Sequence, residues 1–356
     1  MADFKVGIIG CGRPRSVEGS TGFGMAHLHA QGYESSPSAA IVAAADISRQ
    51  NLEAFKTEHN VPRGYTSTED MLREENLDIV SICLWPHLHA PMVQLAAESG
   101  VRAIHCEKPM APTFGEAKKM VAVCEANDVV LTFNHQRRFG EPYAKAKELA
   151  ESGAIGTVER IEAFTSNLFD WGTHWFDMMC YYNNQTPVKW VFGQCDATGG
   201  QEIFGVPVEG RGMSVFQWEN GVLGMLLTGL DDDEEGRLKS GSCFNRIIGD
   251  DGVIEVGVTD GPALRIKGPD TSGKWQPVET NGDLHAGELV KLAVLNLIKS
   301  LETGGTPLLS GRNALQATEL IFATYESSRL RRRIDLPLHI TDSPYITMLE
   351  NADISP

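Results

Sequence analysis

Short apolar runs alternate with amphipathic segments through the first 135 residues of the chain. Runs typical of buried β-strands stand at residues 5–10, 41–45, 78–84, 101–104 and 129–133. Apolar positions repeat with helical spacing at residues 23–31, 48–59 and 113–127, and Ser67-x-x-Asp70 predicts the start of a further short helix. Buried strands that alternate with helices predict an open α/β fold with a parallel sheet of about six βα units.

The pattern changes after residue 135. Strand-like runs then dominate as far as residue 267, at residues 157–167, 189–194, 213–218, 222–228 and 253–258. Glycine turns such as Asn220-Gly221 and Asp251-Gly252 separate them, which is typical of hairpins in an antiparallel sheet. A helix at 141–152 precedes these runs, and helices at 285–303 and 312–332 follow them. We therefore predict an α+β domain with a large, mostly antiparallel open sheet over residues 136–356.

Composition limits the classes of protein and of partner. A chain of 356 residues and 38.9 kDa with 42% hydrophobic and 22% charged residues suits two globular domains. A net charge of −16 repels phosphate backbones and anionic lipids, so we expect neither nucleic acid nor a membrane as a partner. The start of the chain resembles no signal peptide, and the seven scattered cysteines form no C-x-x-C pair. These features favour a cytoplasmic protein with reduced cysteines.

A glycine-rich turn follows the first predicted strand. In Gly10-Cys11-Gly12 the first glycine would permit a tight turn and the second the approach of a pyrophosphate. Asp46 ends the second strand and would accept hydrogen bonds from a ribose 2′-hydroxyl, which favours NAD, although Arg49 leaves NADP open. The turn therefore predicts a Rossmann dinucleotide-binding domain over residues 1–135. A helix cap is the alternative role for Asp46.

An insertion separates this turn from its helix. Residues 13–22 intervene, so Asp46 lies 34 positions after Gly12 rather than about 20. Gly24 and Ala26 are both candidates for the third glycine position. Arg13 or Arg15 would wrap the cofactor phosphates, or the insertion is only a surface loop.

Two further motifs carry a resemblance to a known family. Glu107-Lys108-Pro109 follows a predicted strand, and Asp170-Trp171-Gly172-Thr173-His174 lies in the second half. With the glycine turn, they resemble the glucose-fructose oxidoreductase / inositol dehydrogenase / rhizopine catabolism (Gfo/Idh/MocA) family. The resemblance implies an NAD(P)-dependent oxidoreductase acting on a CH–OH group, usually as a homodimer or homotetramer.

The resemblance also implies roles for individual residues. The expected catalytic residues are Lys108, Asp170 and His174, and substrate contacts add Trp171 and Arg138. The expected cofactor contacts are Gly10, Cys11, Gly12, Arg13, Asp46, Leu84, Trp85, His89, Glu107, Lys108 and Gln136. Alternatively, the arginines of Gln136-Arg137-Arg138 pair with acids between the domains. Trp171, Trp175 and Phe176 offer a stacking face for a sugar ring, or they belong to the core.

The chemistry of these residue types suits alcohol oxidation. The hydroxyl proton must leave with the hydride, and histidine, with an ordinary pKa near 6.5, exchanges protons near neutrality. We expect Thr173 to cap the helix that carries His174, and Asp170 to lie in the loop before it.

The favoured function is hydride transfer between NAD and a secondary hydroxyl of a sugar, glycoside or inositol. The alternatives are a redox-neutral glycosidase or lyase that acts through a transient keto-glycoside, and a non-catalytic ligand sensor. No metal is expected: His27/His29 and His87/His89 lack a third ligand at motif spacing, and each pair predicts one buried and one exposed ring. The acidic run 231–235 is most simply a solvated loop.

Overall fold

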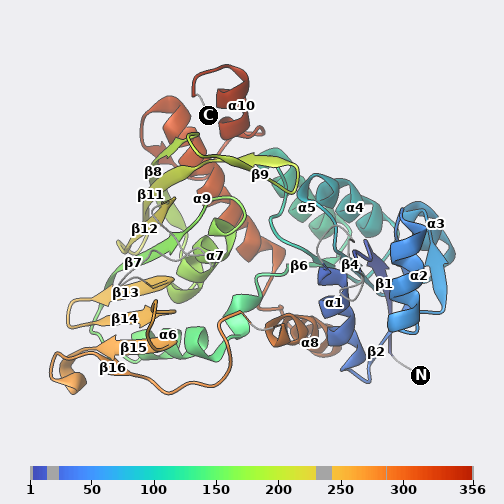
Figure 1. The fold of residues 1–356 in the computed structure, drawn as a ribbon, viewed down its shortest axis with the longest axis horizontal. Coiled ribbons are helices and arrows are strands. Elements are labelled where there is room, and N and C mark those ends of the chain that lie inside the picture. Colours follow the sequence, from blue (N-terminus) through green and yellow to red (C-terminus); the bar gives the residue numbers. More distant parts are fainter. Residues whose placement is uncertain (1–2, 14–23, 230–242, 286, 355–356) are drawn as a thin grey trace. The chain divides into compact units, whose positions relative to one another are not determined.

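The computed structural model describes residues 3–13, 24–229, 243–285 and 287–354. These residues divide into two compact units (Figure 1). Unit 1 comprises residues 1–111, 116–136 and 286–314, and unit 2 comprises residues 112–115, 137–285 and 315–356. None of the helices among the described residues is long and apolar enough to cross a membrane.

A six-stranded parallel sheet forms the centre of unit 1, as predicted. Its strand order is β3-β2-β1-β4-β5-β6, so the connections run in opposite directions on the two sides of β1. The strands are β1 (Phe4–Ile9), β2 (Ala39–Ala45), β3 (Arg63–Tyr65), β4 (Ile79–Ile82), β5 (Ala103–Cys106) and β6 (Val130–Phe133). Ligands of such sheets bind at the carboxyl ends of the strands beside the point of reversal.

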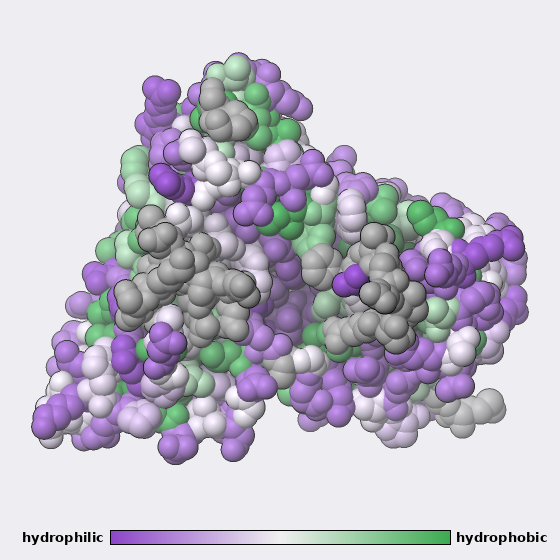
Figure 2. Space-filling view, in the orientation of Figure 1, coloured by the Kyte–Doolittle hydropathy of each residue, from purple (hydrophilic) through white to green (hydrophobic). Residues whose placement is uncertain are grey.

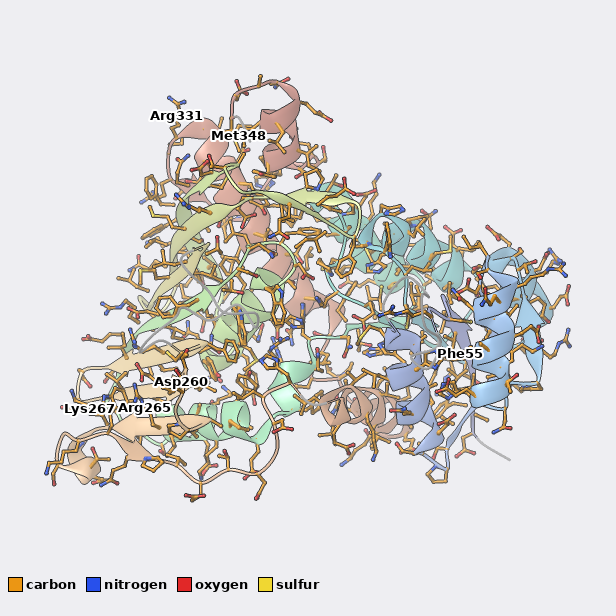
Figure 3. All side chains as sticks on the ribbon, viewed as in Figure 1. Phe55, Asp260, Arg265, Lys267, Arg331 and Met348 are labelled. Carbon is orange, nitrogen blue, oxygen red and sulfur yellow. The ribbon has the colours of Figure 1, made fainter. Side chains whose placement is uncertain are left out.

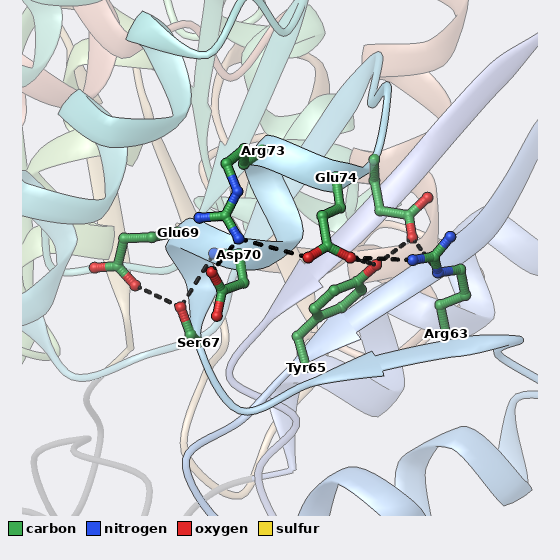
Figure 4. Close-up of polar contacts among 8 residues, drawn as sticks. Arg63, Tyr65, Ser67, Glu69, Asp70, Arg73 and Glu74 are labelled. Carbon is green, nitrogen blue, oxygen red and sulfur yellow. Dashed lines mark hydrogen bonds and ion pairs between the residues drawn. The ribbon is translucent and has the colours of Figure 1, made fainter.

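The first five helices are α1 (Met25–Glu34), α2 (Arg49–Glu58), α3 (Thr68–Glu74), α4 (Pro86–Glu98) and α5 (Phe114–Ala126). Four of them begin within two residues of the predicted positions, whereas α4 has no counterpart among the predicted elements. Ser67 caps α3 by accepting the N–H of Asp70 at 3.1 Å (Figure 4). Next to this cap, Arg63 and Glu74 form an ion pair at the sheet edge. Hydrophilic residues predominate on the visible surface of α2 and α3 (Figure 2).

One helix of unit 1 comes from the far end of the chain. Helix α8 (Glu288–Thr303) packs on α1, and a Cβ at Gly32 of α1 would lie 2.8 Å from Val294 of α8. Val294 joins the same core as Phe55, which points from α2 toward the sheet (Figure 3). The predicted second domain, residues 136–356, includes α8, whereas the structure places this helix in unit 1. The apolar spacing of α8 does not reveal which sheet the helix covers.

Unit 2 contains a nine-stranded, mostly antiparallel sheet. Its order is β16-β15-β14-β13-β7-β12-β11-β8-β17, and only β12 and β7 run parallel among its described pairs. The strands are β7 (Val158–Thr165), β8 (Val188–Asp196), β11 (Arg211–Trp218), β12 (Leu223–Thr228), β13 (Asn245–Gly249), β14 (Val253–Val256), β15 (Leu264–Lys267), β16 (Gln276–Pro277) and β17 (Ile334–Asp335). A separate hairpin joins β9 (Gln201–Ile203) and β10 (Val206–Val208).

Helices cover one face of this sheet. They are α6 (Glu141–Glu151), α7 (Gly172–Tyr182) and α9 (Gly311–Leu330), with α10 (Pro344–Glu350) near the end of the chain (Figure 1). Trp175, Phe176 and Phe216 are fully buried between these helices and the sheet. The expectation that Trp175 and Phe176 stack on a sugar is therefore wrong, because both rings belong to the core.

The opposite face carries two kinds of side chain. Apolar residues on β8, β11 and β12 include Phe192 and Met213, which are 43% and 37% exposed. A ladder of charges follows on β7, β13, β14 and β15, where Arg246 bridges Glu162 at 3.1 Å and Glu255 at 2.7 Å. Arg265 continues the ladder from β15 (Figure 3). No described helix lies over this face in Figure 1.

Candidate functional site

Two glycines shape the loop after β1. Gly10 and Gly12 have φ angles of +82° and +64°, which glycine adopts without strain. A Cβ on Gly10 would lie 2.6 Å from the carbonyl oxygen of Cys83 and equally close to Leu84. The loop therefore packs closely on the end of β4, where a side chain at position 10 would have no room.

Asp46 is fixed to this loop by hydrogen bonds. Its Oδ2 accepts the N–H groups of Cys11 at 2.8 Å and Gly12 at 3.3 Å, and its Oδ1 accepts the N–H of Ser48 at 2.7 Å. Ser48, rather than Asp46, is the N-cap of α2. A carboxylate beside the glycine loop fits the position that recognises an adenosine ribose.

The inserted segment is described only at its ends. Arg13 is exposed, whereas Arg15 and the other residues from 14 to 23 lie outside the described residues. Gly24 is the N-cap of α1 and Ala26 is fully buried, so the choice between them for the third glycine position stays open.

Lys108 stands just beyond the carboxyl end of β5, as predicted. It is half-buried, and Glu107 beside it is 6% exposed. Glu107 Oε1 accepts hydrogen bonds from His29 Nε2 at 2.8 Å and from Asn134 Nδ2 at 2.7 Å, and Oε2 accepts the N–H of Lys108 at 3.3 Å. His29 Nδ1 lies 2.8 Å from Ser81 Oγ. Helix α1 and strands β4, β5 and β6 are thus joined under the Glu-Lys-Pro loop.

This network keeps Glu107 ionised. Burial alone would raise the pKa of Glu107, but the hydrogen bonds and charge of His29, with the amide of Asn134, outweigh burial and lower it to about 2. Both carboxylate oxygens accept hydrogen bonds from within unit 1, and Glu107 thereby holds the backbone of Lys108. Its contact with the cofactor stays a prediction.

His89 has a similar structural role. It is fully buried, with Nδ1 2.9 Å from the carbonyl oxygen of Pro109 and Nε2 3.0 Å from that of Leu84. Burial lowers its pKa, although these carbonyl contacts favour the charged ring. The predicted contact of His89 with the cofactor is therefore replaced by a link between β4 and the Glu-Lys-Pro loop. Trp85, by contrast, is 49% exposed.

Two amide side chains, Asn134 and Gln136, follow the carboxyl end of β6. The side-chain oxygens of Asn134 and Gln136 are buried and accept no hydrogen bond from the described residues. Buried amide oxygens without a donor are suited to a bound group that brings one. Together with the glycine loop and Asp46, they fit a dinucleotide.

In unit 2, Asp170 and His174 come from one tight turn between β7 and α7. Asn167 Oδ1 accepts the N–H of Asp170 at 2.7 Å, and its carbonyl accepts the N–H of Gly172 at 2.8 Å. A Cβ at Gly172 would lie 2.8 Å from that carbonyl oxygen, which explains the glycine in the motif. Trp171 is the N-cap of α7 and makes no side-chain cap, so the predicted cap by Thr173 is wrong because Asn167 closes the turn.

His174 lies in the first turn of α7, where the helix dipole is positive. It is 3% exposed, and Asp170 is 7% exposed. Arg137 supplies a positive charge that attracts Asp170. Its guanidinium lies 4.8 Å from the centre of the Trp175 ring and 5.4 Å from that of Trp171. Arg137 is 4% exposed, and this burial lowers its pKa.

Arg138 is not placed to bind a substrate. Its Nε and Nη2 donate to the two carboxylate oxygens of Asp177 at 2.8 and 2.7 Å, and the two side chains are 1% and 2% exposed. Both residues belong to unit 2, so the alternative of a pair between domains is also wrong. The pair joins the segment after β6 to α7.

The histidine pairs differ from each other. His87 is exposed and His89 is buried, as predicted, but His27 and His29 are both buried. His27 Nδ1 lies 2.9 Å from His59 Nε2, and Glu58 and Glu34 bind the same rings. At this distance one ring nitrogen donates a hydrogen bond to the other, so we interpret the group as a hydrogen-bonded contact between α1 and the end of α2. The acidic run at 231–235 lies outside the described residues.

Sequence reasoning missed His29, Asn134, Asn167 and Glu209. All four are buried polar residues outside the motifs, and each forms a hydrogen bond that fixes a motif or its turn. Their partners are distant in sequence, except for Asn167, whose position three residues before Asp170 signals an Asx turn.

Comparisons with known proteins agree with this geometry. Residues 4–135 match a family described as an oxidoreductase family with an NAD-binding Rossmann fold. The chain is 26% identical to D-apiose dehydrogenase from Paraburkholderia graminis, over 97% of this chain and 92% of that protein. It is 23% identical to myo-inositol 2-dehydrogenase from Thermotoga maritima, over 93% of this chain and 98% of that protein.

A solved structure shows the same fold over nearly the whole chain. An oxidoreductase from Agrobacterium radiobacter, solved with NAD+, L-tartaric acid and magnesium, aligns with a TM-score of 0.77 at 20% identity and covers 94% of this chain and 98% of that one. These matches agree with the resemblance inferred from the motifs: residues 4–135 match the Gfo/Idh/MocA oxidoreductase family, which has an NAD-binding Rossmann fold, and the chain is similar over most of its length to a sugar dehydrogenase and an inositol dehydrogenase.

Proposed function

We propose that this protein is an NAD-dependent dehydrogenase acting on a secondary hydroxyl of a sugar, glycoside or inositol. One observation carries the proposal: a Rossmann unit holds Lys108 at a strand end through a buried Glu107–His29 network. The Asp170–His174 turn of unit 2 supplies a proton-transfer group of the kind that such a reaction needs. The names of the two relatives, D-apiose dehydrogenase and myo-inositol 2-dehydrogenase, support a polyol as substrate.

Each residue has one role in this proposal. His174 accepts the proton of the reacting hydroxyl during oxidation and returns it during reduction. His174 lies in the first turn of α7, near the positive end of the helix dipole. Lys108 donates a hydrogen bond to the reacting oxygen and stabilises its developing negative charge. Asp170 orients the imidazole or binds a neighbouring hydroxyl.

The cofactor is held by unit 1. The backbone of Gly10, Cys11 and Gly12 would receive the pyrophosphate, Asp46 the adenosine ribose, and Leu84, Trp85 and Gln136 the nicotinamide end. NAD, when bound, supplies the hydride acceptor for alcohol oxidation. The amide oxygen of Gln136, buried without a donor among the described residues, is the observation that favours a contact there.

The first test removes the cation. Lys108→Met should lower turnover about 100–1000-fold and leave NAD affinity almost unchanged, because a preorganised donor acts mainly on the transition state. Lys119, an exposed lysine on α5, provides the matched control Lys119→Met, which should behave as wild type. Normal turnover by Lys108→Met would refute the assignment.

A screen for NADH across inositols, aldoses and simple glycosides separates the proposed function from its alternatives. A dehydrogenase releases NADH in proportion to product. A redox-neutral glycosidase or lyase forms product without net NADH, and a ligand sensor shows no turnover. Calorimetric titration with NAD adds a check, since failure to bind NAD contradicts the first two functions.

We also propose that the open face of the unit 2 sheet binds a second copy of this chain. Exposed Phe192 and Met213 give the face an apolar half, and the alternating charges of Glu162, Arg246 and Glu255 give the other half a fixed pattern. Light scattering after size exclusion should give a mass at least twice 38.9 kDa for the wild type and a smaller one for Phe192→Asp. A wild-type mass equal to that of one chain would contradict this contact.

A further inference from the structure

A buried carboxylate outside the proposed reaction machinery connects three elements of unit 2. Glu209 lies between β10 and β11 and is 2% exposed. Its Oε1 accepts the N–H of Leu168 at 2.5 Å, and its Oε2 accepts the hydroxyl of Tyr325 on α9 at 2.6 Å. Short hydrogen bonds to an ionised acceptor are among the stronger ones in proteins.

The Leu168 amide belongs to the turn that carries the proton-transfer group. Asp170 and His174 follow within six residues, and Asn167 closes the turn from inside. The side chain of Leu168 is fully buried and packs where a Cβ of Gly212 would otherwise lie, at 2.9 Å. The bond to Glu209 therefore fixes the turn from outside, against β11 and α9.

We infer that Glu209, held by Tyr325, is a positioning residue that keeps Asp170 and His174 in place, and that protonation of Glu209 loosens the turn. The inference rests on the proposed function, because that function assigns proton transfer to His174 in this turn. It adds a residue that touches neither substrate nor cofactor and acts through the Leu168 amide.

The ionised and neutral forms of Glu209 hold the turn differently. A carboxylate accepts both hydrogen bonds with charge assistance, whereas a carboxylic acid turns one oxygen into a donor and binds the amide more weakly. Burial raises the pKa of Glu209 to about 7, although the hydrogen bonds from Tyr325 and Leu168 lower it. The change from one form to the other therefore falls near neutrality.

The groups that face Glu209 do not titrate in this range. Tyr325 faces it from α9 and Tyr345 from α10, and burial raises the pKa of both phenols. From β8, burial raises the pKa of Cys195 to about 12, and backbone hydrogen bonding lowers that of Asp196. Glu209 is the member of this group that changes charge between pH 5 and pH 9.

Nuclear magnetic resonance of the protein with ¹⁵N-labelled leucine reads this ionisation directly. The Leu168 amide signal, assigned by its loss in Leu168→Met, should shift with a midpoint near pH 7 in the wild type. Tyr325→Phe removes a donor to the ionised form and should raise the midpoint by about one pH unit. Glu209→Gln should abolish the shift, and Tyr345→Phe, whose hydroxyl does not bond Glu209, should leave it unchanged.

Turnover gives the functional half of the test. In the oxidative direction the acid limb of kcat should move to higher pH in Tyr325→Phe, while KM for NAD stays constant. Glu209→Gln, whose neutral side chain holds the amide without charge assistance, should lower kcat at neutral pH and remove the contribution of Glu209 to the pH profile. A merely structural contact would lower activity equally at every pH and leave the limb of Tyr325→Phe in place. The inference is overturned if the Leu168 signal does not titrate, or if both variants keep the wild-type pH profile. The resonance measurement needs no substrate, so failure of the proposed function is seen separately as absent turnover.

Discussion

Replacing Glu209 by glutamine should make unit 2 more stable in alkaline solution. The glutamine carbonyl can still accept the Leu168 amide, and its NH₂ group can donate to the oxygen of Tyr325, so both contacts are kept. What the substitution removes is the ionisation of a carboxyl that is 2% exposed. Its effect on the free energy of unfolding is therefore a function of pH.

The size of the effect follows from the pKa. Burial raises the pKa of Glu209 from its ordinary value of 4.5 to about 7, so the folded chain holds this proton more tightly than the unfolded chain does. The contribution of Glu209 to stability is then complete below pH 4.5 and is lost as pH rises through about 7. The whole loss corresponds to about 3 kcal/mol. Wild type and Glu209→Gln should match at pH 4.5, and the variant should be more stable by up to about 3 kcal/mol at pH 8.

Urea unfolding followed by tryptophan fluorescence measures this difference. Five of the six tryptophans, all except Trp85, lie in unit 2, so the signal reports the unit that contains Glu209. Glu219→Gln, at an exposed carboxylate in the turn between β11 and β12, is the matched control and should show no pH-dependent difference. A Glu209→Gln variant that is equally stable or less stable than wild type at pH 8 would refute the reasoning.

Three other predictions follow from the contacts of buried residues. Gly10→Ala places a Cβ 2.6 Å from a carbonyl oxygen at a φ of +82°, so NAD affinity measured by calorimetry should fall at least tenfold; an unchanged affinity would contradict the proposed loop. His29→Leu removes a donor to the buried carboxylate of Glu107 and should cost unit 1 about 1.5–3 kcal/mol in urea unfolding, and it should also lower turnover; a neutral result would show that the network is dispensable. Arg138→Met leaves Asp177 as a buried, unpaired charge and should cost about 3–5 kcal/mol, most of which Arg138→Met combined with Asp177→Leu should restore; a double variant as unstable as the single one would contradict the pairing.

The elements of the fold could be predicted largely from local pattern. The five buried runs of the first half became β1, β2, β4, β5 and β6, and the position of Lys108 after β5 followed from them. The turn with Asp170 and His174 was likewise local, since both residues lie within one motif before α7. Periodicity suffices in such cases because the signal lies within a single element.

The roles of buried polar residues could not be predicted in this way. Glu107 accepts a hydrogen bond from His29, which lies 78 positions earlier in the chain. Glu209 accepts one from the amide of Leu168, which lies 41 positions earlier. Arg138 resembled a ligand contact in sequence, yet its partner Asp177 lies 39 residues away on α7. Such pairs depend on how strands and helices pack, which spacing along the chain does not encode.

The return of α8 to unit 1 has a consequence for synthesis on the ribosome. Residues 1–136 alone contain the whole parallel sheet, but they lack the apolar side chains of Val294, Leu297 and Ile298 that complete its core. A nascent chain released as far as Gln136 therefore exposes the surface of α1 that these residues later cover. The core of unit 1 can be completed only after residues 137–285 have been translated. While that segment is being synthesised, the uncovered surface of α1 is available to a chaperone.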